Sequence, residues 1–71
     1  MTKDQAVAAL HLIVKAVEDT VNEAGPLGAP AGVMYAAFTA RGMSLDTFNQ
    51  VTAAMVSAGR IARRGDVFYP A

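Results

Sequence analysis

Only three residues, Gly42-Met43-Ser44, link two segments with helical periodicity, and this short link leaves few arrangements open to the chain. A glycine after a helix favours a left-handed stop, and a serine before the next helix can cap its first free N–H groups. Two short helices joined by a three-residue turn that contains glycine make a helix-turn-helix. The sequence therefore predicts helices at about 30–41 and about 45–58, packed against each other across this turn.

Both segments have apolar residues three and four positions apart, which is the spacing of an amphipathic helix. The residues predicted to face inward are Val33, Met34, Ala37 and Phe38 in the first, and Leu45, Phe48, Val51, Thr52, Met55 and Val56 in the second. Pro30 is favourable at the first position of a helix. Gly32 is unfavourable inside a helix, so we expect its role to be the close packing of a neighbouring helix.

A longer helix is predicted before these two, from about 3 to 24. Thr2 and Gln5 have the spacing of a capping box, and Gly25-Pro26 ends the helix. Its apolar residues form a stripe wider than one small neighbour needs, so we expect part of the stripe to contact a second copy of the chain. The predicted homodimer interface consists of Val7, Leu10, Val14, Val17 and Val21.

Glycine and proline mark the remaining connections. The segment 25–30 holds two of each and is predicted to be a loop. After Gly59, a hairpin is predicted over about 60–69, with a two-residue turn at Arg64-Gly65. That turn pairs Arg63 with Asp66 and Ile61 with Phe68. These elements predict a mainly α fold with a small β-hairpin (α+β), formed by residues 1–71 as a single domain.

Length and composition limit the classes of protein. A chain of 71 residues, 54% of them apolar, is near the lower limit for burying an adequate core alone, which favours oligomerisation. The absence of cysteine excludes a disulfide framework and suits a reducing compartment. The longest apolar run is too short to span a bilayer, and the start lacks the order of a signal peptide. We therefore expect a soluble cytoplasmic protein with no membrane segment.

The sequence offers no candidate catalytic or metal site. His11 is the only histidine, and a chain without cysteine or a second histidine cannot assemble the usual metal or nucleophile–base groups. Glu18 and Asp19 have the spacing of helical partners for Lys15. We expect no enzyme and no cofactor.

Charge is distributed unevenly along a chain whose net charge is zero. In residues 1–39, two lysines against four acidic residues give −2; in residues 40–71, four arginines against two aspartates give +2. All four arginines therefore lie in the second half, and three of them lie in a five-residue stretch of the predicted hairpin, residues 60–64. This asymmetry favours an anion-binding end of the molecule.

The order of the elements, three helices followed by a Gly-X-Ile step and a short two-stranded ribbon, resembles the winged helix-turn-helix family of DNA-binding domains. The segments that carry the resemblance are Tyr35-Ala36-Ala37-Phe38, Gly42-Met43-Ser44, Phe48…Met55, Gly59-Arg60-Ile61 and Val67-Phe68-Tyr69. The resemblance implies that the helix at 45–58 enters the major groove of double-stranded DNA. It also implies that the ribbon, the wing, touches the adjacent backbone or minor groove.

Residues for each type of contact follow from this resemblance. Amides pair with adenine, and threonine or alanine meets the thymine methyl group, so the implied base-reading residues are Thr47, Asn49, Gln50 and Ala53, with Ala54 as a further candidate. The implied phosphate-binding residues are Arg41, Ser44, Arg60, Arg63 and Arg64. The outward face of the helix departs from a strong DNA-binding pattern, because it has no lysine or arginine and carries Asp46.

Two functions are consistent with these features. The first is a small dimeric winged-helix DNA-binding protein, a transcriptional regulator, with double-stranded DNA and a second copy as partners. The alternative is a winged-helix module that binds other proteins and not DNA. The arginine-rich hairpin favours the first, and the uncharged outward face of the helix at 45–58 favours the second.

Overall fold

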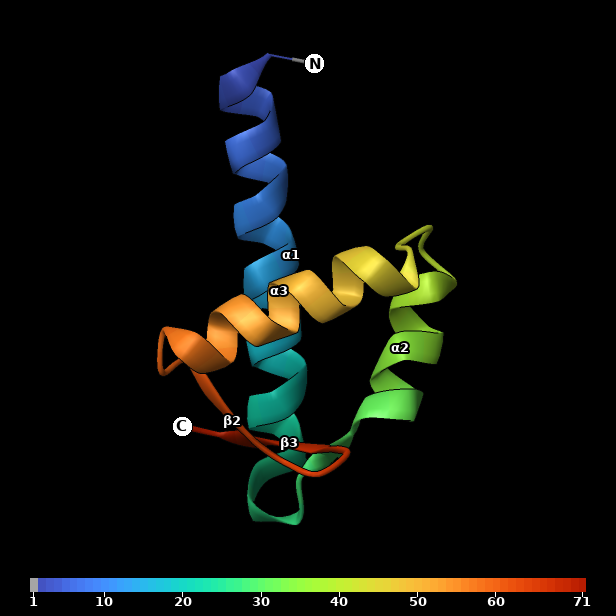
Figure 1. Cartoon of the computed structure of the whole chain (residues 1–71), viewed down its shortest axis with the longest axis vertical. Helices are drawn as coiled ribbons and strands as arrows, with labels where there is room; N and C mark the ends of the chain where they lie inside the picture. Colours follow the sequence, from blue (N-terminus) through green and yellow to red (C-terminus); the bar gives the residue numbers. More distant parts are fainter. Residues whose placement is uncertain (1) are drawn as a thin grey trace.

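The computed structural model describes residues 2–71. In chain order the elements are α1 (Lys3–Ala24), the 3-10 turn η1 (Gly25–Leu27), β1 (Ala29–Pro30), α2 (Ala31–Thr39), α3 (Leu45–Ser57), β2 (Ile61–Arg64) and β3 (Val67–Pro70). The fold is thus mainly helical with a small antiparallel sheet, which confirms the predicted α+β class (Figure 1).

Local side-chain bonds set the start of α1 and α3. The Thr2 hydroxyl accepts a hydrogen bond from the Gln5 N–H at 3.2 Å, and the Gln5 side chain accepts one from the Thr2 N–H at 3.0 Å. The Ser44 hydroxyl accepts from the Thr47 N–H at 3.1 Å. Both caps satisfy N–H groups that have no partner inside the helix.

The helix-turn-helix link is longer than the predicted boundary of α2 suggests, because five residues, 40–44, separate α2 from α3. The helix ends at Thr39, not near Arg41, because the next residues turn with shorter-range bonds, such as Arg41 N–H to Phe38 O at 3.0 Å. Gly42 then takes a φ of 94°, and the Met43 N–H donates to Phe38 O at 3.2 Å. These bonds direct the chain from α2 into α3 over residues 40–44.

The sheet has a third strand that was predicted as loop and helix start. Its strand order is β1-β3-β2, and β1 pairs Ala29 with Phe68 and Pro30 with Val67. Pro30 is therefore the last residue of an edge strand and the N-cap of α2, not its first helical residue. A proline is tolerated there, since an edge strand leaves one side without ladder bonds.

The predicted register of the β2–β3 hairpin is wrong. The strands pair Arg64 with Val67, Arg63 with Phe68 and Ile61 with Pro70, so the turn residues are Gly65 and Asp66. Gly65 has a φ of 59°, which a two-residue hairpin turn accepts most easily from glycine. Ile61 and Phe68 still share a face as diagonal neighbours, which is why both registers satisfy the core.

The core lies where the sheet, the C-terminal half of α1 and the inner faces of α2 and α3 meet. It consists of Val17, Val21, Ala29, Met34, Phe38, Phe48, Val51, Met55, Ile61 and Phe68. The Phe48 ring is central, with its centroid 5.8 Å from that of Tyr35 and 6.3 Å from those of Phe38 and Phe68. Thr52 is also buried, and its hydroxyl donates to Phe48 O at 2.9 Å.

Three residues predicted to face inward do not. Val33 is 67% exposed and Leu45 49% exposed, and Ala37 is also exposed. The short α2 reaches the core through Met34 and Phe38, one turn apart, and this leaves its neighbouring positions outside.

The N-terminal half of α1 extends beyond α3 as an arm, which is visible at the blue end of the chain (Figure 1). Val17 and Val21, both in the C-terminal half, are the buried residues of this helix. On the arm, Val7 is 44%, Leu10 47% and Leu12 71% exposed. One end of this 22-residue helix thus belongs to the core, and no other element of residues 2–71 covers the other end.

We predict that Gly28→Ala lowers the free energy of unfolding by about 2–4 kcal/mol, because its φ of 81° is strained for alanine and a methyl group would overlap Val67 and Tyr69. Gly32→Ala is the matched control. A Cβ at Gly32 meets nothing within 4 Å, so the predicted packing role of this glycine is wrong, and alanine there is neutral or stabilising by up to about 1 kcal/mol. Urea unfolding measures both changes; equal stabilities of the two variants would contradict this prediction.

Candidate nucleic-acid interface

The outward face of α3 holds the predicted base-reading residues. Thr47, Asn49, Gln50 and Ala53 are all exposed, as is Ala54. The opposite face buries Phe48, Val51, Thr52 and Met55. A helix of 13 residues is about 20 Å long, and the width of one helix matches the major groove of B-DNA. The candidate residues therefore form one continuous surface that the core does not use.

Two of these residues have side-chain amides that are not bonded within the chain. Neither the Asn49 nor the Gln50 amide makes a hydrogen bond with any group in residues 2–71. A side-chain amide has two N–H donors and an oxygen acceptor, which is the set that pairs with an adenine edge. Asn49 and Gln50 therefore have the donors and the acceptor that base reading needs, and no group in residues 2–71 uses them.

The N-terminal end of α3 is partly committed to its own cap. The Ser44 hydroxyl accepts from the Thr47 N–H and donates to the Thr47 hydroxyl oxygen at 3.0 Å. The Ser44 hydroxyl must break its bond to the Thr47 hydroxyl before it can donate to a phosphate. Thr47 takes part in both of these bonds. Asp46 lies in the first turn, where it favours the helix dipole and disfavours a bound anion.

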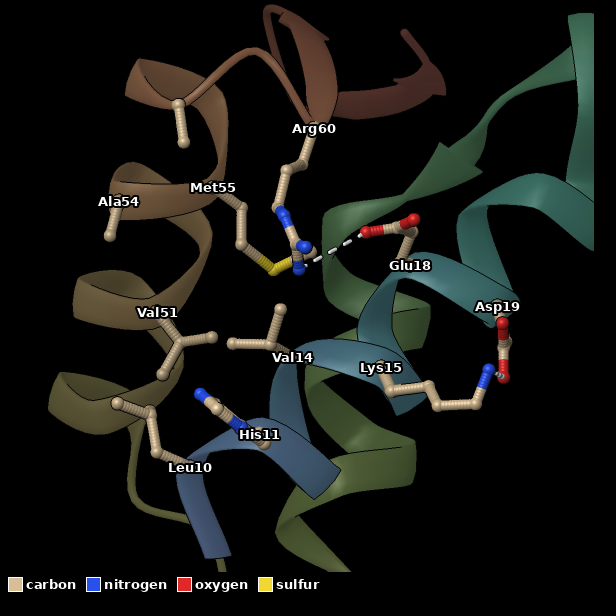
Figure 2. Close-up of a pocket in the computed structure, with 11 residues that line it drawn as sticks. Leu10, His11, Val14, Lys15, Glu18, Asp19, Val51, Ala54, Met55 and Arg60 are labelled. Carbon is tan, nitrogen blue, oxygen red and sulfur yellow. Dashed lines mark ion pairs between the residues drawn. The ribbon is translucent and has the colours of Figure 1, made fainter. Parts of the chain in front are cut away.

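Arg60 and Arg63 each have a carboxylate partner in the chain. Arg60 Nη1 lies 3.5 Å from Glu18 Oε2, so α1 and the start of β2 are joined by an ion pair (Figure 2). Arg63 Nη2 lies 3.7 Å from Asp66 Oδ1, its Nε donates to Gly65 O at 2.8 Å, and its guanidinium stacks 5.1 Å from the Phe68 ring centroid. Exposed pairs of this kind contribute about 0–1 kcal/mol, so both arginines can exchange a carboxylate for a phosphate at small cost.

Arg41 and Arg64 have no carboxylate partner in residues 2–71. Arg64 precedes the turn of the hairpin, and the central carbon of its guanidinium lies 5.5 Å from the centroid of the Tyr69 ring. Arg41 borders a groove of about 500 Å3 between the start of α3 and the arm, whose apolar walls include Leu12, Phe38 and Met43. Of the four arginines, these two are the most available to an outside anion.

The candidate dimer residues divide into two groups. Val17 and Val21 are fully buried in the core of one chain and cannot contact a second copy, so this part of the predicted interface is wrong. Val7 and Leu10 are exposed on the arm, and Val14 is half-buried at the edge of the core. A heptad pattern marks which residues share a face, but it does not say which half of the helix its own domain covers.

The sequence did not reveal a groove between α1 and the C-terminal half of α3. Its volume is about 580 Å3, and its lining residues include Leu10, Val14, Val51, Ala54, Met55 and Ala58 (Figure 2). Glu18 was expected to pair with Lys15, but at this groove it pairs with Arg60, and Lys15 pairs with Asp19 alone at 3.5 Å. Leu12 was also overlooked, although an apolar residue on the polar side of a helix signals a surface with another use.

Residues 2–71 contain no group of three or more His, Cys, Asp or Glu side chains that could hold a metal ion. No helix in the same range is long and apolar enough to cross a membrane.

A scan against protein-family models and comparisons with curated proteins and with solved structures gave no significant match.

We predict that Asn49→Ala and Gln50→Ala leave the free energy of unfolding unchanged or raise it by up to about 0.5 kcal/mol, since both amides are exposed and alanine favours the helix. Phe48→Ala, one residue away and buried, lowers it by about 3–5 kcal/mol. Urea titrations of the three variants check this. A loss above about 1 kcal/mol for either amide variant would mean that the outward face of α3 is structural.

Proposed function

We propose that the chain is a cytoplasmic winged-helix protein that binds double-stranded DNA as a transcriptional regulator. In this proposal α3 enters the major groove and the β2–β3 hairpin is the wing that contacts the phosphate backbone. The cysteine-free composition suits the reducing compartment in which such a protein acts.

The observation that carries the proposal is the pair of amides on the outward face of α3. Asn49 and Gln50 are exposed, one after the other, and have no bonding partner in residues 2–71. Their replacement is not expected to cost stability, so a structural role does not explain them. Hydrogen bonding to base edges does explain polar groups of this type on an exposed helix.

The positions of the arginines support the same proposal. Arg41 precedes the turn into α3, Arg60 follows the end of α3, and Arg64 lies at the hairpin tip. Cations at both ends of a reading helix and on an adjacent ribbon match the way proteins position themselves on a duplex through its phosphates. Such contacts fix register and orientation and leave sequence reading to α3.

A protein-interaction module remains the second candidate, and one observation favours it. No lysine or arginine lies on the outward face of α3, where Asp46 is a negative charge in the first turn. Phosphate contacts supply most of the affinity of DNA-binding proteins, so a face without cations depends on its flanks for binding.

The two candidates are separated by titrating the protein with a short fluorescent duplex of mixed sequence at low and at moderate salt. The DNA proposal expects binding that weakens as salt rises, because phosphate contacts release counterions. An absence of binding at low salt would leave the protein-interaction module as the better proposal.

We predict that Arg64→Ala reduces the slope of log affinity against log salt by about 0.9 for each bound chain, the value for one neutralised phosphate. The loss is equal on all sequences, because phosphates carry no base identity. Lys15→Ala removes an exposed cation from α1, which pairs with Asp19, and serves as the control, with an unchanged slope. An unchanged slope for Arg64→Ala would exclude the hairpin tip from the DNA contact.

We predict that Asn49→Ala and Gln50→Ala each weaken binding to a selected cognate site by about 1–3 kcal/mol. Binding to random DNA remains unchanged, because only base contacts distinguish the two targets. The control is Asn22→Ala, which removes an exposed amide from α1. Equal losses on cognate and random DNA in a mobility-shift competition would contradict base reading by these residues.

A further inference from the structure

The arm of α1 exposes apolar side chains that no other part of residues 2–71 covers. Val7 and Leu10 are about half exposed, and residues 2–8 are all exposed. A short helical segment is marginal in water without tertiary contacts, because helix stability in proteins comes mainly from the packing of an apolar face. A neighbour that covers this surface therefore stabilises the arm and removes its apolar side chains from water.

A groove that fits such a neighbour lies beside the arm. It is the groove of about 580 Å3 between α1 and the C-terminal half of α3, with Leu10 and Val14 on one wall and Val51, Ala54 and Met55 on the other (Figure 2). Figure 2 shows the Val14, Val51 and Met55 side chains pointing into the space between the two helices. The distance between packed helices depends on the side chains at their contact, and Ala54 and Ala58 allow a close approach.

We propose that the occupant of this groove is the arm of a second copy of the chain, running antiparallel to the first. Leu10 belongs both to the groove wall and to the exposed stripe of the arm. A two-fold axis close to Leu10 therefore places each arm in the groove of the other copy, so that one self-complementary surface forms both sides of the interface.

Charge complementarity sets the direction. Lys3, Val7, Leu10, Val14 and Glu18 follow one another at spacings of three and four along α1, so they share one stripe. Lys3 has no carboxylate partner in residues 2–71, and Glu18 lies at the far end of the groove. Glu18 pairs with Arg60 of its own chain at 3.5 Å, and an antiparallel arrangement brings Lys3 and the positive end of one helix dipole to the same carboxylate of the other copy. A parallel pair sets Lys3 against Lys3 and Glu18 against Glu18.

This inference does not rest on the proposed DNA binding. The groove uses the flank of α3 that carries Ala54 and Ala58, whereas the candidate base-reading amides are Asn49 and Gln50, which are not among its lining residues. A failure of the dimer leaves the DNA proposal standing, and a failure of DNA binding leaves the dimer standing.

The first test is sedimentation equilibrium over a range of protein concentrations. The wild-type chain is expected at twice its mass of 7.4 kDa in the high micromolar range. Val7→Asp and Leu10→Asp are each expected to weaken association on the order of tenfold or more, because an unpaired charge would be buried. Neither residue belongs to the core, so circular dichroism is expected to show folded monomers.

Leu12→Asp is the matched control, because Leu12 is 71% exposed on the same arm but is not among the residues of this groove. It is expected to leave the dimer intact. A monomeric wild-type chain at high micromolar concentration would overturn the proposal. Equal dissociation by Leu12→Asp would also overturn it, since the contact would not then be confined to the groove.

The second test measures the direction by cross-linking, which the absence of native cysteine makes specific. Single variants Lys3→Cys and Glu18→Cys are mixed and oxidised with glutathione disulfide. The antiparallel arrangement expects a covalent dimer that contains one chain of each variant, in excess over the dimers formed by either variant alone. A Lys3→Cys chain that cross-links to itself as well as it does in the mixture would contradict the arrangement.

Discussion

The burial of Phe68 is the contact on which the rest of this fold depends. Phe68 lies in the middle strand, between Ala29 of β1 and Arg63 of β2, and its side chain is fully buried. Its ring meets that of Phe48 edge to face, at an interplanar angle of 82°. A domain of this size has few large side chains to bury, so one ring that joins the sheet to α3 also fixes where the hairpin lies relative to that helix.

The same small core explains the surface left over on α1. Val17 and Val21 complete the interior, and no further helix or strand is present in residues 2–71 to cover the arm. The apolar residues of the arm then point to self-association, while the outward face of α3 and the hairpin point to DNA. The amides proposed to read DNA, Asn49 and Gln50, lie outside the groove proposed for the second copy, although that groove includes Arg60, a candidate phosphate contact. If both proposals hold, the dimer presents α3 twice around a two-fold axis.

Some of the fold could be predicted from the sequence because its signals are local. The caps at Thr2 and Ser44 act within three residues, and the fold class followed from them together with the helical periodicity. The hairpin register could not be predicted, because two registers place Ile61 and Phe68 on one face and only the turn at Gly65 decides between them. The ion pair between Glu18 and Arg60 joins residues far apart in the chain, so no short-range pattern indicated it.

The candidate site was predictable to a similar extent. The periodicity of α3 placed Asn49 and Gln50 on the outer face, where they lie. The predicted partnership of Arg63 with Asp66 is also present, although the turn lies one residue further along the chain than predicted. The stripe on α1 could not reveal that Val17 and Val21 belong to the core, because periodicity describes a face and not its neighbour.

The central claim is that α3 contacts DNA through its amides, and nuclear magnetic resonance tests this directly. The chain has two asparagines and two glutamines; Gln5 and Asn22 lie in α1, and Asn49 and Gln50 in α3. Side-chain amide signals of 15N-labelled protein are followed while a duplex that carries the selected cognate site is added. We predict that the signals of Asn49 and Gln50 shift and that those of Gln5 and Asn22 do not. Shifts confined to the α1 amides, or none at saturating DNA, would contradict the claim.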